Sequence, residues 1–263
     1  MMERLRFSAN ISFLWPEIDD PIERLSRAAE AGFTRVERMF VHDLDPAALR
    51  AELDLRGLDL TLFDPFPGDW EQGERGLLSL AGREDDCRTS IHEAIAAAGS
   101  LGTHMLNVLG GVLPDGTSRE AALSTAAENL RACAPAAQAG GITLLVEPIN
   151  LIDMPGYAFP TISAALELVE KVDHPAVGIQ FDTYHVAQMG GDILLEADRS
   201  RNHIRYVQVA DVPGRHEPGT GNLPLPEFFE LLGTFYEGFI GLEYRPKTST
   251  VDGLAWLPRR LRG

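Results

Sequence analysis

The sequence predicts a (β/α)8 barrel of the TIM type, and three observations support this α/β fold class. The chain has 263 residues, close to the roughly 250 that such a barrel uses as one domain. Strand-like runs and helix-like segments alternate from one end to the other, as expected for parallel β-α-β units. No linker or shift in composition divides the chain, so we expect residues 1–263 to form a single domain.

The strand-like segments number eight, which is the number that a TIM barrel requires. Several are continuously apolar, as at 142–146, a pattern typical of strands buried on both faces of a parallel sheet. An open doubly wound sheet is the main rival, but no GxGxxG motif follows the first segment. The predicted strands are 7–12, 34–40, 58–63, 104–109, 142–147, 177–182, 203–209 and 239–243.

The intervening segments carry apolar residues at helical spacing, as in 22–29, 91–98, 162–169 and 225–232. Asp20 and Asp45 each precede a proline, which predicts an N-cap followed by proline in the first helical turn. Gly32 and Gly57 stand where the first two helices should end. The 64–83 segment is the longest predicted loop, and its length favours a functional lid or binding loop over a simple surface excursion.

The charge balance disfavours two classes of partner. Lys and Arg number 23 against 39 Asp and Glu, which gives a formal net charge of −16. Nucleic acids and anionic membranes are bound mainly through Lys and Arg, and the sequence has no basic run outside its last residues. We therefore expect a small-molecule partner. The oligomeric state stays open, a homo-oligomer included.

The compartment is expected to be the cytoplasm. The sequence contains neither the apolar stretch of a signal peptide nor a window long enough to span a membrane. Cys87 and Cys133 are the two cysteines and form no CxxC pair. We expect them to be buried thiols rather than zinc ligands or a disulfide.

Oxygen-bearing side chains follow each of the last four predicted strands. Because the carboxyl ends of barrel strands meet at one mouth, these four side chains should converge. A single acid at a strand end is usually a helix cap or an ion-pair partner, but four in succession are harder to reach by chance. An all-oxygen set favours Mg²⁺ or Mn²⁺ over zinc or copper. The four predicted metal ligands are Glu147, Asp182, Gln208 and Glu243.

Further candidates lie near this predicted mouth. His185 follows Asp182 by three residues, so its ring could reach a substrate hydroxyl or carbonyl. His216 lies in the loop after the seventh strand and could be a ligand or simply a loop residue. Arg75 in the long loop could bind a carboxylate or pair with a surface acid. Trp70 could form part of the pocket wall or of the core.

Several motifs together resemble the hydroxypyruvate isomerase family, which belongs to the xylose-isomerase-like barrels of the sugar isomerase and epimerase superfamily. The resemblance spans almost the whole chain, and its most specific block follows the seventh strand. It is carried by 68–70, 73–76, 147–150, 153–157, 182–185, 209–221 and 241–244.

The resemblance implies a metal-assisted isomerase that moves a carbonyl group through an enediol. The family's metal ligands match Glu147, Asp182, Gln208 and Glu243, and its acid/base pair matches Glu147 and Glu243. His185 and Arg215 would then orient the substrate oxygens. The implied reaction converts hydroxypyruvate to tartronate semialdehyde. A 2-oxo-tetronate isomerase, a ketose 3-epimerase and a non-enzymatic binding barrel remain alternatives.

Overall fold

A closed barrel of eight parallel strands forms the centre of the molecule, so the predicted fold class is confirmed. The computed structural model describes residues 4–263; the first three residues of the predicted domain 1–263 lie outside it. The strands follow chain order, and β1 pairs with both β2 and β8. Each observed strand overlaps a predicted segment. They are β1 (Arg6–Asn10), β2 (Arg35–Phe40), β3 (Asp59–Asp64), β4 (Met105–Asn107), β5 (Thr143–Val146), β6 (Val177–Asp182), β7 (Ile204–Val209) and β8 (Phe239–Leu242).

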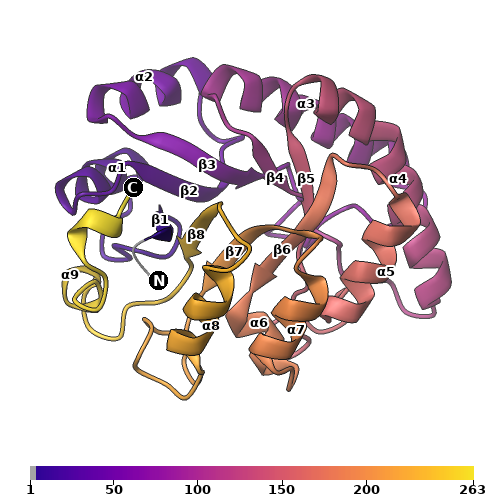
Figure 1. The fold of residues 1–263 in the computed structure, drawn as a ribbon. Helices are drawn as coiled ribbons and strands as arrows, with labels where there is room; N and C mark the ends of the chain where they lie inside the picture. The colour runs from indigo at the N-terminus through magenta and orange to yellow at the C-terminus, as the bar shows by residue number, and fades with distance from the viewer. Residues whose placement is uncertain (1–3) are drawn as a thin grey trace.

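The helices surround the barrel, and the C-terminal segment lies beside α1 (Figure 1). The predicted helical segments all form, and the caps act as expected. Asp20 accepts a hydrogen bond from the backbone of Ile22, and Asp45 from that of Ala48. The helices are α1 (Pro21–Glu30), α2 (Pro46–Arg56), α3 (Glu84–Leu101), α4 (Arg119–Ala139), α5 (Ile162–Val172), α6 (Thr183–Gln188), α7 (Ile193–Ser200), α8 (Leu225–Leu232) and α9 (Thr250–Gly253), followed by a 3₁₀ turn (Arg259–Leu261).

A small apolar layer fills the barrel interior. Leu62, Leu145 and Tyr206 pack together although they come from β3, β5 and β7, which are not neighbours in the sheet. Their contact therefore crosses the barrel, as in the side-chain layers of other TIM barrels. The interior is consequently closed in its middle, and a cavity can open only at an end.

The two cysteines lie inside the fold. Cys87 and Cys133 are buried and free, as predicted. Within residues 4–263, no helix combines the length and the apolar character needed to cross a membrane.

Candidate active site

Seven strands of the barrel deliver a buried polar side chain at or next to their carboxyl ends, and β2 delivers Glu37, which lies three residues before the end of β2 but is paired with the last residue of β1. All eight are carboxylates or carboxamides, and none is more than 8% exposed. Because these ends share one side of the barrel, the side chains surround a common space. Six of them line a cavity of about 320 Å³. In chain order the eight are Asn10, Glu37, Asp64, Asn107, Glu147, Asp182, Gln208 and Glu243.

The predicted acidic residues from the second half of the barrel lie together. One ligand atom each from Glu147, Asp182, His185 and Glu243 falls within 4.8 Å of the others. Gln208 joins them by donating a hydrogen bond from Nε2 to Glu243. The structure thus brings together all four side chains that the sequence placed at the mouth, and adds His185.

Burial makes this cluster electrostatically costly. It raises the pKa of Glu147 to about 8, with a further rise from the neighbouring Asp182 and an opposing effect of Arg215. Burial also raises the pKa of Asp182, and holds that of Glu243 well above its usual range. Carboxylates this close favour a nearby cation or a bound proton.

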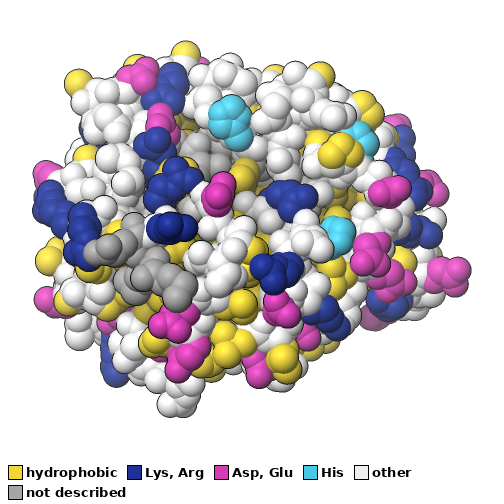
Figure 2. All heavy atoms as spheres, viewed as in Figure 1, with side chains coloured by type: hydrophobic (Ala, Val, Ile, Leu, Met, Phe, Trp, Pro, Cys, Tyr) yellow, Lys and Arg dark blue, Asp and Glu magenta, His cyan; other side chains and the backbone are white. Residues whose placement is uncertain are grey.

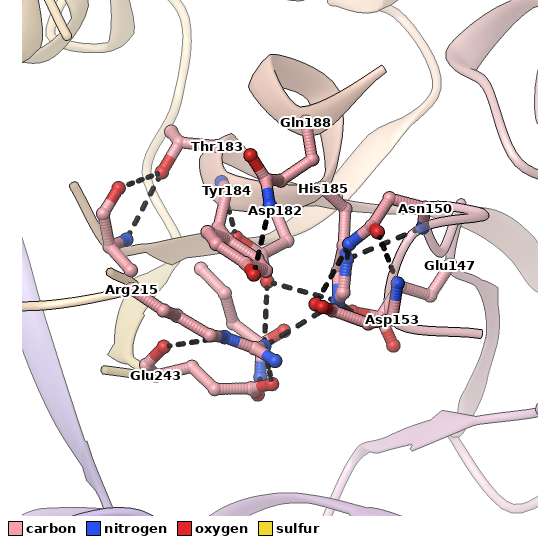
Figure 3. Close-up of polar contacts among 12 residues, drawn as sticks. Glu147, Asn150, Asp153, Asp182, Thr183, Tyr184, His185, Gln188, Arg215 and Glu243 are labelled. Atoms are coloured by element: carbon pink, nitrogen blue, oxygen red, sulfur yellow. Dashed lines mark hydrogen bonds and ion pairs between the residues drawn. The ribbon is translucent and has the colours of Figure 1, made fainter. Parts of the chain in front are cut away.

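Arg215 lies across the cluster and supplies one positive charge (Figure 3). Its Nη2 donates to Asp182 Oδ2 at 3.1 Å and to Glu243 Oε1. The guanidinium carbon is 4.7 Å from the ring centroids of both Phe13 and Tyr184. The backbone of Arg215 has a φ of +56°, a conformation that non-glycine residues rarely adopt and that often marks functional sites.

Asn150 fixes the protonation of the His185 ring. Its side-chain Oδ1 accepts from the backbone N–H groups of Ile152 and Asp153 at 3.0 and 2.8 Å, so its Nδ2 must face the ring. Nδ2 lies 2.7 Å from His185 Nδ1. Burial, and secondarily Arg215, hold the pKa of His185 well below its usual range. A neutral ring that accepts at Nδ1 carries its proton on Nε2, which faces Asp182 and Glu147 at 3.6 and 3.8 Å.

Glu37 organises the opposite side of the cluster. Fully buried, it accepts hydrogen bonds from Asn10 at 2.8 Å, from Gln208 at 2.9 Å and from Tyr206. Asn10 also donates to Glu243 Oε2 at 3.0 Å. A Cβ on Gly241 would lie 2.4 Å from Glu37 Oε2, so only glycine leaves room for the carboxylate. Glu37 therefore holds the partners that orient Glu243.

The sequence interpretation did not assign the polar ends of β1–β4. One signal could have found them: an Asn, Asp or Glu near the carboxyl end of each strand, as in the second half. Asn107 shows its value, because its Nδ2 donates to Glu147 Oε2 at 2.7 Å.

The three remaining candidates lie in loops. Trp70 and Arg75 both line the cavity, and the Arg75 guanidinium carbon stands 4.1 Å from the Trp70 ring centroid. His216 lies outside the cavity, with Nδ1 2.7 Å from the backbone oxygen of Arg245. Arg245 itself lines the cavity.

The acidic cluster fits a hard divalent cation. Glu147 Oε1 is buried and has no hydrogen-bond partner among the described residues, although buried carboxylate oxygens are normally paired. Carboxylate and carboxamide oxygens are the donors that Mg²⁺ and Mn²⁺ prefer. A metal would be held by these oxygens, with His185 Nε2–H left to donate a hydrogen bond.

The sequence is similar to known proteins over nearly its whole length. A family model for the xylose isomerase-like TIM barrel matches residues 25–260. A 2-oxo-tetronate isomerase of Cupriavidus necator is 42% identical over 253 residues, which cover 96% of this chain and 97% of the relative. The hydroxypyruvate isomerase of Escherichia coli is 39% identical over 254 residues, or 96% and 98% of the two chains.

A solved structure gives the same result. A crystal structure from Brucella melitensis, named as an AP endonuclease of family 2, superposes with a TM-score of 0.92 at 39% identity, over 96% of this chain and 97% of that one. The chain therefore belongs to the xylose isomerase-like TIM barrel family and, with near full-length relatives that are isomerases, is itself an isomerase.

Proposed function

We propose that the protein isomerises a short 2-oxo-3-hydroxy acid to the 3-oxo-2-hydroxy acid. Hydroxypyruvate, which would give tartronate semialdehyde, and the one-carbon-longer 2-oxo-tetronate both have this arrangement. One observation carries the proposal: Glu147 and Glu243 come from non-adjacent strands and reach one buried cluster inside a cavity that also holds arginine. The names of the relatives agree with this chemistry.

The two glutamates supply the proton transfers. One removes the proton from C3, and the other returns a proton at C2, while the hydroxyl proton passes from O3 to O2. The reaction therefore needs no oxidant or reductant. Burial raises the pKa of Glu147 to about 8 in the metal-free protein; a bound cation would lower it and keep the carboxylate ionised, as a general base requires.

A divalent cation completes this arrangement. We assign Glu147, Asp182, Gln208 and Glu243 as its ligands, and Mg²⁺ or Mn²⁺ as the ion. Gln208 would bind through Oε1 only after its amide turns, because here its Nε2 faces Glu243 while its Oε1 accepts from Gln180 at 2.7 Å. Such an ion polarises a carbonyl or hydroxyl oxygen as a Lewis acid. Arg215 and the neutral His185 ring then orient the substrate oxygens by donating hydrogen bonds.

The substrate carboxylate requires its own cation. Arg75, stacked on Trp70, and Arg245 both line the cavity and are the two candidates. His216 reaches the substrate only indirectly in this scheme, because it contacts the Arg245 backbone.

A nucleic acid is not the partner that we propose. The Brucella structure is named as an endonuclease, but this chain carries a net charge of −16. On the face shown in Figure 2, basic and acidic side chains are interspersed. Phosphate backbones are bound by many Lys and Arg residues gathered on one surface. A small anionic acid needs only one or two arginines, and the cavity contains such residues.

Proton NMR in D₂O tests the proposal directly. With Mn²⁺ or Mg²⁺ present, hydroxypyruvate should give a product with deuterium at C2. Glu147→Gln and Glu243→Gln should each lower kcat at least 10²-fold, roughly the usual contribution of a positioned base. Glu230→Gln, on the exposed face of α8, is the matched control and should leave kcat unchanged.

Other results would replace the proposal. Inversion of configuration at C3 of a ketose, with deuterium at that carbon and the carbonyl still at C2, would indicate a 3-epimerase. Full turnover by both glutamine variants, or no turnover of any 2-oxo acid or ketose by the metal-loaded protein, would contradict the assignment.

A further inference from the structure

Asp64 is a buried acid at the cavity that the proposed chemistry does not use. It ends β3, is 5% exposed and lines the cavity. The described residues form no ion pair with it, and its charged neighbours Glu147 and Glu37 are themselves acids. Burial, with Glu147 next in effect, raises the pKa of Asp64 well above its usual range. A side-chain hydrogen bond with Asn107 opposes this rise in pKa only in part, and a buried carboxyl with no cation beside it is costly to keep.

The adjoining strand end also needs a hydrogen-bond donor. Asn107 on β4 lies between Asp64 and Glu147 and contacts both: its Nδ2 donates to Glu147 Oε2 at 2.7 Å, and a side-chain hydrogen bond joins it to Asp64. Its Oδ1 is buried without a partner. Asp64 and Asn107 thus present adjacent acceptor oxygens on a cavity wall. A hydroxyl group is the chemical complement of such a wall, because it donates to a carboxylate or carboxamide and also accepts from a protonated carboxyl.

The polar groups of the smallest candidate substrate are already assigned. Hydroxypyruvate offers a carboxylate, the C2 oxygen and the C3 oxygen. The first needs an arginine, and the other two belong at the acidic cluster where the carbonyl moves. No group of a three-carbon substrate is left for Asp64. A four-carbon acid carries one more hydroxyl, on the carbon attached to C3.

The space available also suits the larger substrate. The cavity measures about 320 Å³, and Asp64 lies on the half of the barrel away from Asp182 and Arg215, two strands before Glu147. A chain that continues beyond C3 towards β3 and β4 would bring its terminal hydroxyl to this wall.

We propose that Asp64 is a specificity-determining residue that binds the C4 hydroxyl of the substrate; this inference rests on the proposed isomerase function. The preferred substrate is then a 2-oxo-tetronate rather than hydroxypyruvate. Asp64 takes no part in moving the proton between C3 and C2.

Three substrates separate the C4 hydroxyl from chain length. They are hydroxypyruvate, 3-hydroxy-2-oxobutanoate and 2-oxo-tetronate, the last two with the same C3 configuration. The decisive quantity is a ratio of specificity constants, in which the value for 2-oxo-tetronate is divided by the value for 3-hydroxy-2-oxobutanoate. The native enzyme should give a ratio of about 3 to 100, the range that spans a hydrogen bond to a neutral and to a charged carboxyl.

Variants then assign the ratio to Asp64. Asp64→Ala should bring it to about 1 while hydroxypyruvate is still isomerised, and Asp64→Asn should give an intermediate value. Asp153→Ala removes an exposed acid of the same cavity and should leave the ratio as in the native enzyme. The ratio cancels effects on steps that both substrates share, including any change at Glu147.

The outcomes distinguish this inference from the proposed function. A native ratio near 1, or an unchanged ratio in Asp64→Ala, overturns the role of Asp64 but leaves the isomerase intact. No turnover of any of the three substrates overturns the proposed function and this inference with it. If Asp64→Ala does not fold, the native ratio and Asp64→Asn still decide the question.

Discussion

Replacing Glu147 by Gln should stabilise the metal-free protein at alkaline pH while removing its activity. Burial and the nearby Asp182 raise the pKa of Glu147 from 4.5 to about 8. An acid whose pKa is higher in the folded protein binds more protons there than in the unfolded chain. Its ionisation therefore lowers stability progressively as pH rises from about 4.5 to about 8.

The size of the effect follows from that shift. At about 1.4 kcal/mol for each pH unit, the contribution of Glu147 is close to zero at about pH 4 and roughly 4 kcal/mol of destabilisation at about pH 8. Glu147→Gln removes the ionisation but keeps an oxygen that can accept from Asn107. The variant should therefore match the native protein near pH 4.5 and exceed its free energy of unfolding by a few kcal/mol at pH 8.

Urea unfolding in EDTA at pH 4.5 and pH 8, followed by circular dichroism, measures this difference. The exposed Glu230→Gln should follow the native protein at both values. If Glu147→Gln were no more stable than the native protein at pH 8, or gained equally at both pH values, Glu147 would not carry a buried, unfavourable charge.

Three further predictions concern the surroundings of the cluster. Asn150→Ala removes the side-chain NH₂ group that donates to His185 and should lower the specificity constant about 10-fold or more. Asn150→Asp also lacks this NH₂ group and should not restore the constant. An unchanged constant would refute the role of Asn150. Gly241→Ala should cost about 1–3 kcal/mol in urea unfolding, because the new Cβ would lie 2.4 Å from Glu37 Oε2, and an unchanged unfolding midpoint would contradict this packing. EDTA should abolish turnover, and Mn²⁺ should restore it. At about 100 times its Kd, Mn²⁺ should also raise the free energy of unfolding by about 2.7 kcal/mol. Retained turnover after complete chelation would exclude the metal.

The fold could be predicted almost completely because its signals are local. Most strands are short, mainly apolar segments. Asp20 and Asp45 mark the starts of two helices, and in the structure their side chains cap those helices. The positions of Glu147 and Glu243 at strand ends could be predicted for the same reason, because each directly follows an apolar strand.

The missing parts of the site depend on contacts that are remote in sequence. Glu37 was hidden because β2 continues to Phe40 and its pairing with β3 is irregular on both sides of Glu37. Its partners Tyr206 and Gln208 lie far along the chain, at separations of 169 and 171 residues. The placement of Arg215 depends on a left-handed backbone conformation that nothing in an arginine predicts. Single Asn or Asp residues such as Asn10 and Asp64 are equally common in turns and caps.

The ring of eight polar strand ends divides into two halves with different physical tasks. The ends of β5–β8 hold three carboxylates close enough to favour a cation or a bound proton, so substitutions there change the charge on which the proposed chemistry depends. The ends of β1 and β4 contact this cluster through amides, Asn10 with Glu243 and Asn107 with Glu147. Asp64 adjoins the second of these bridges through Asn107 and lines the cavity. On the proposed assignment, substrate choice can change at β3 while the proton-transfer residues after β5 and β8 stay in place, so one barrel could serve acids of different length.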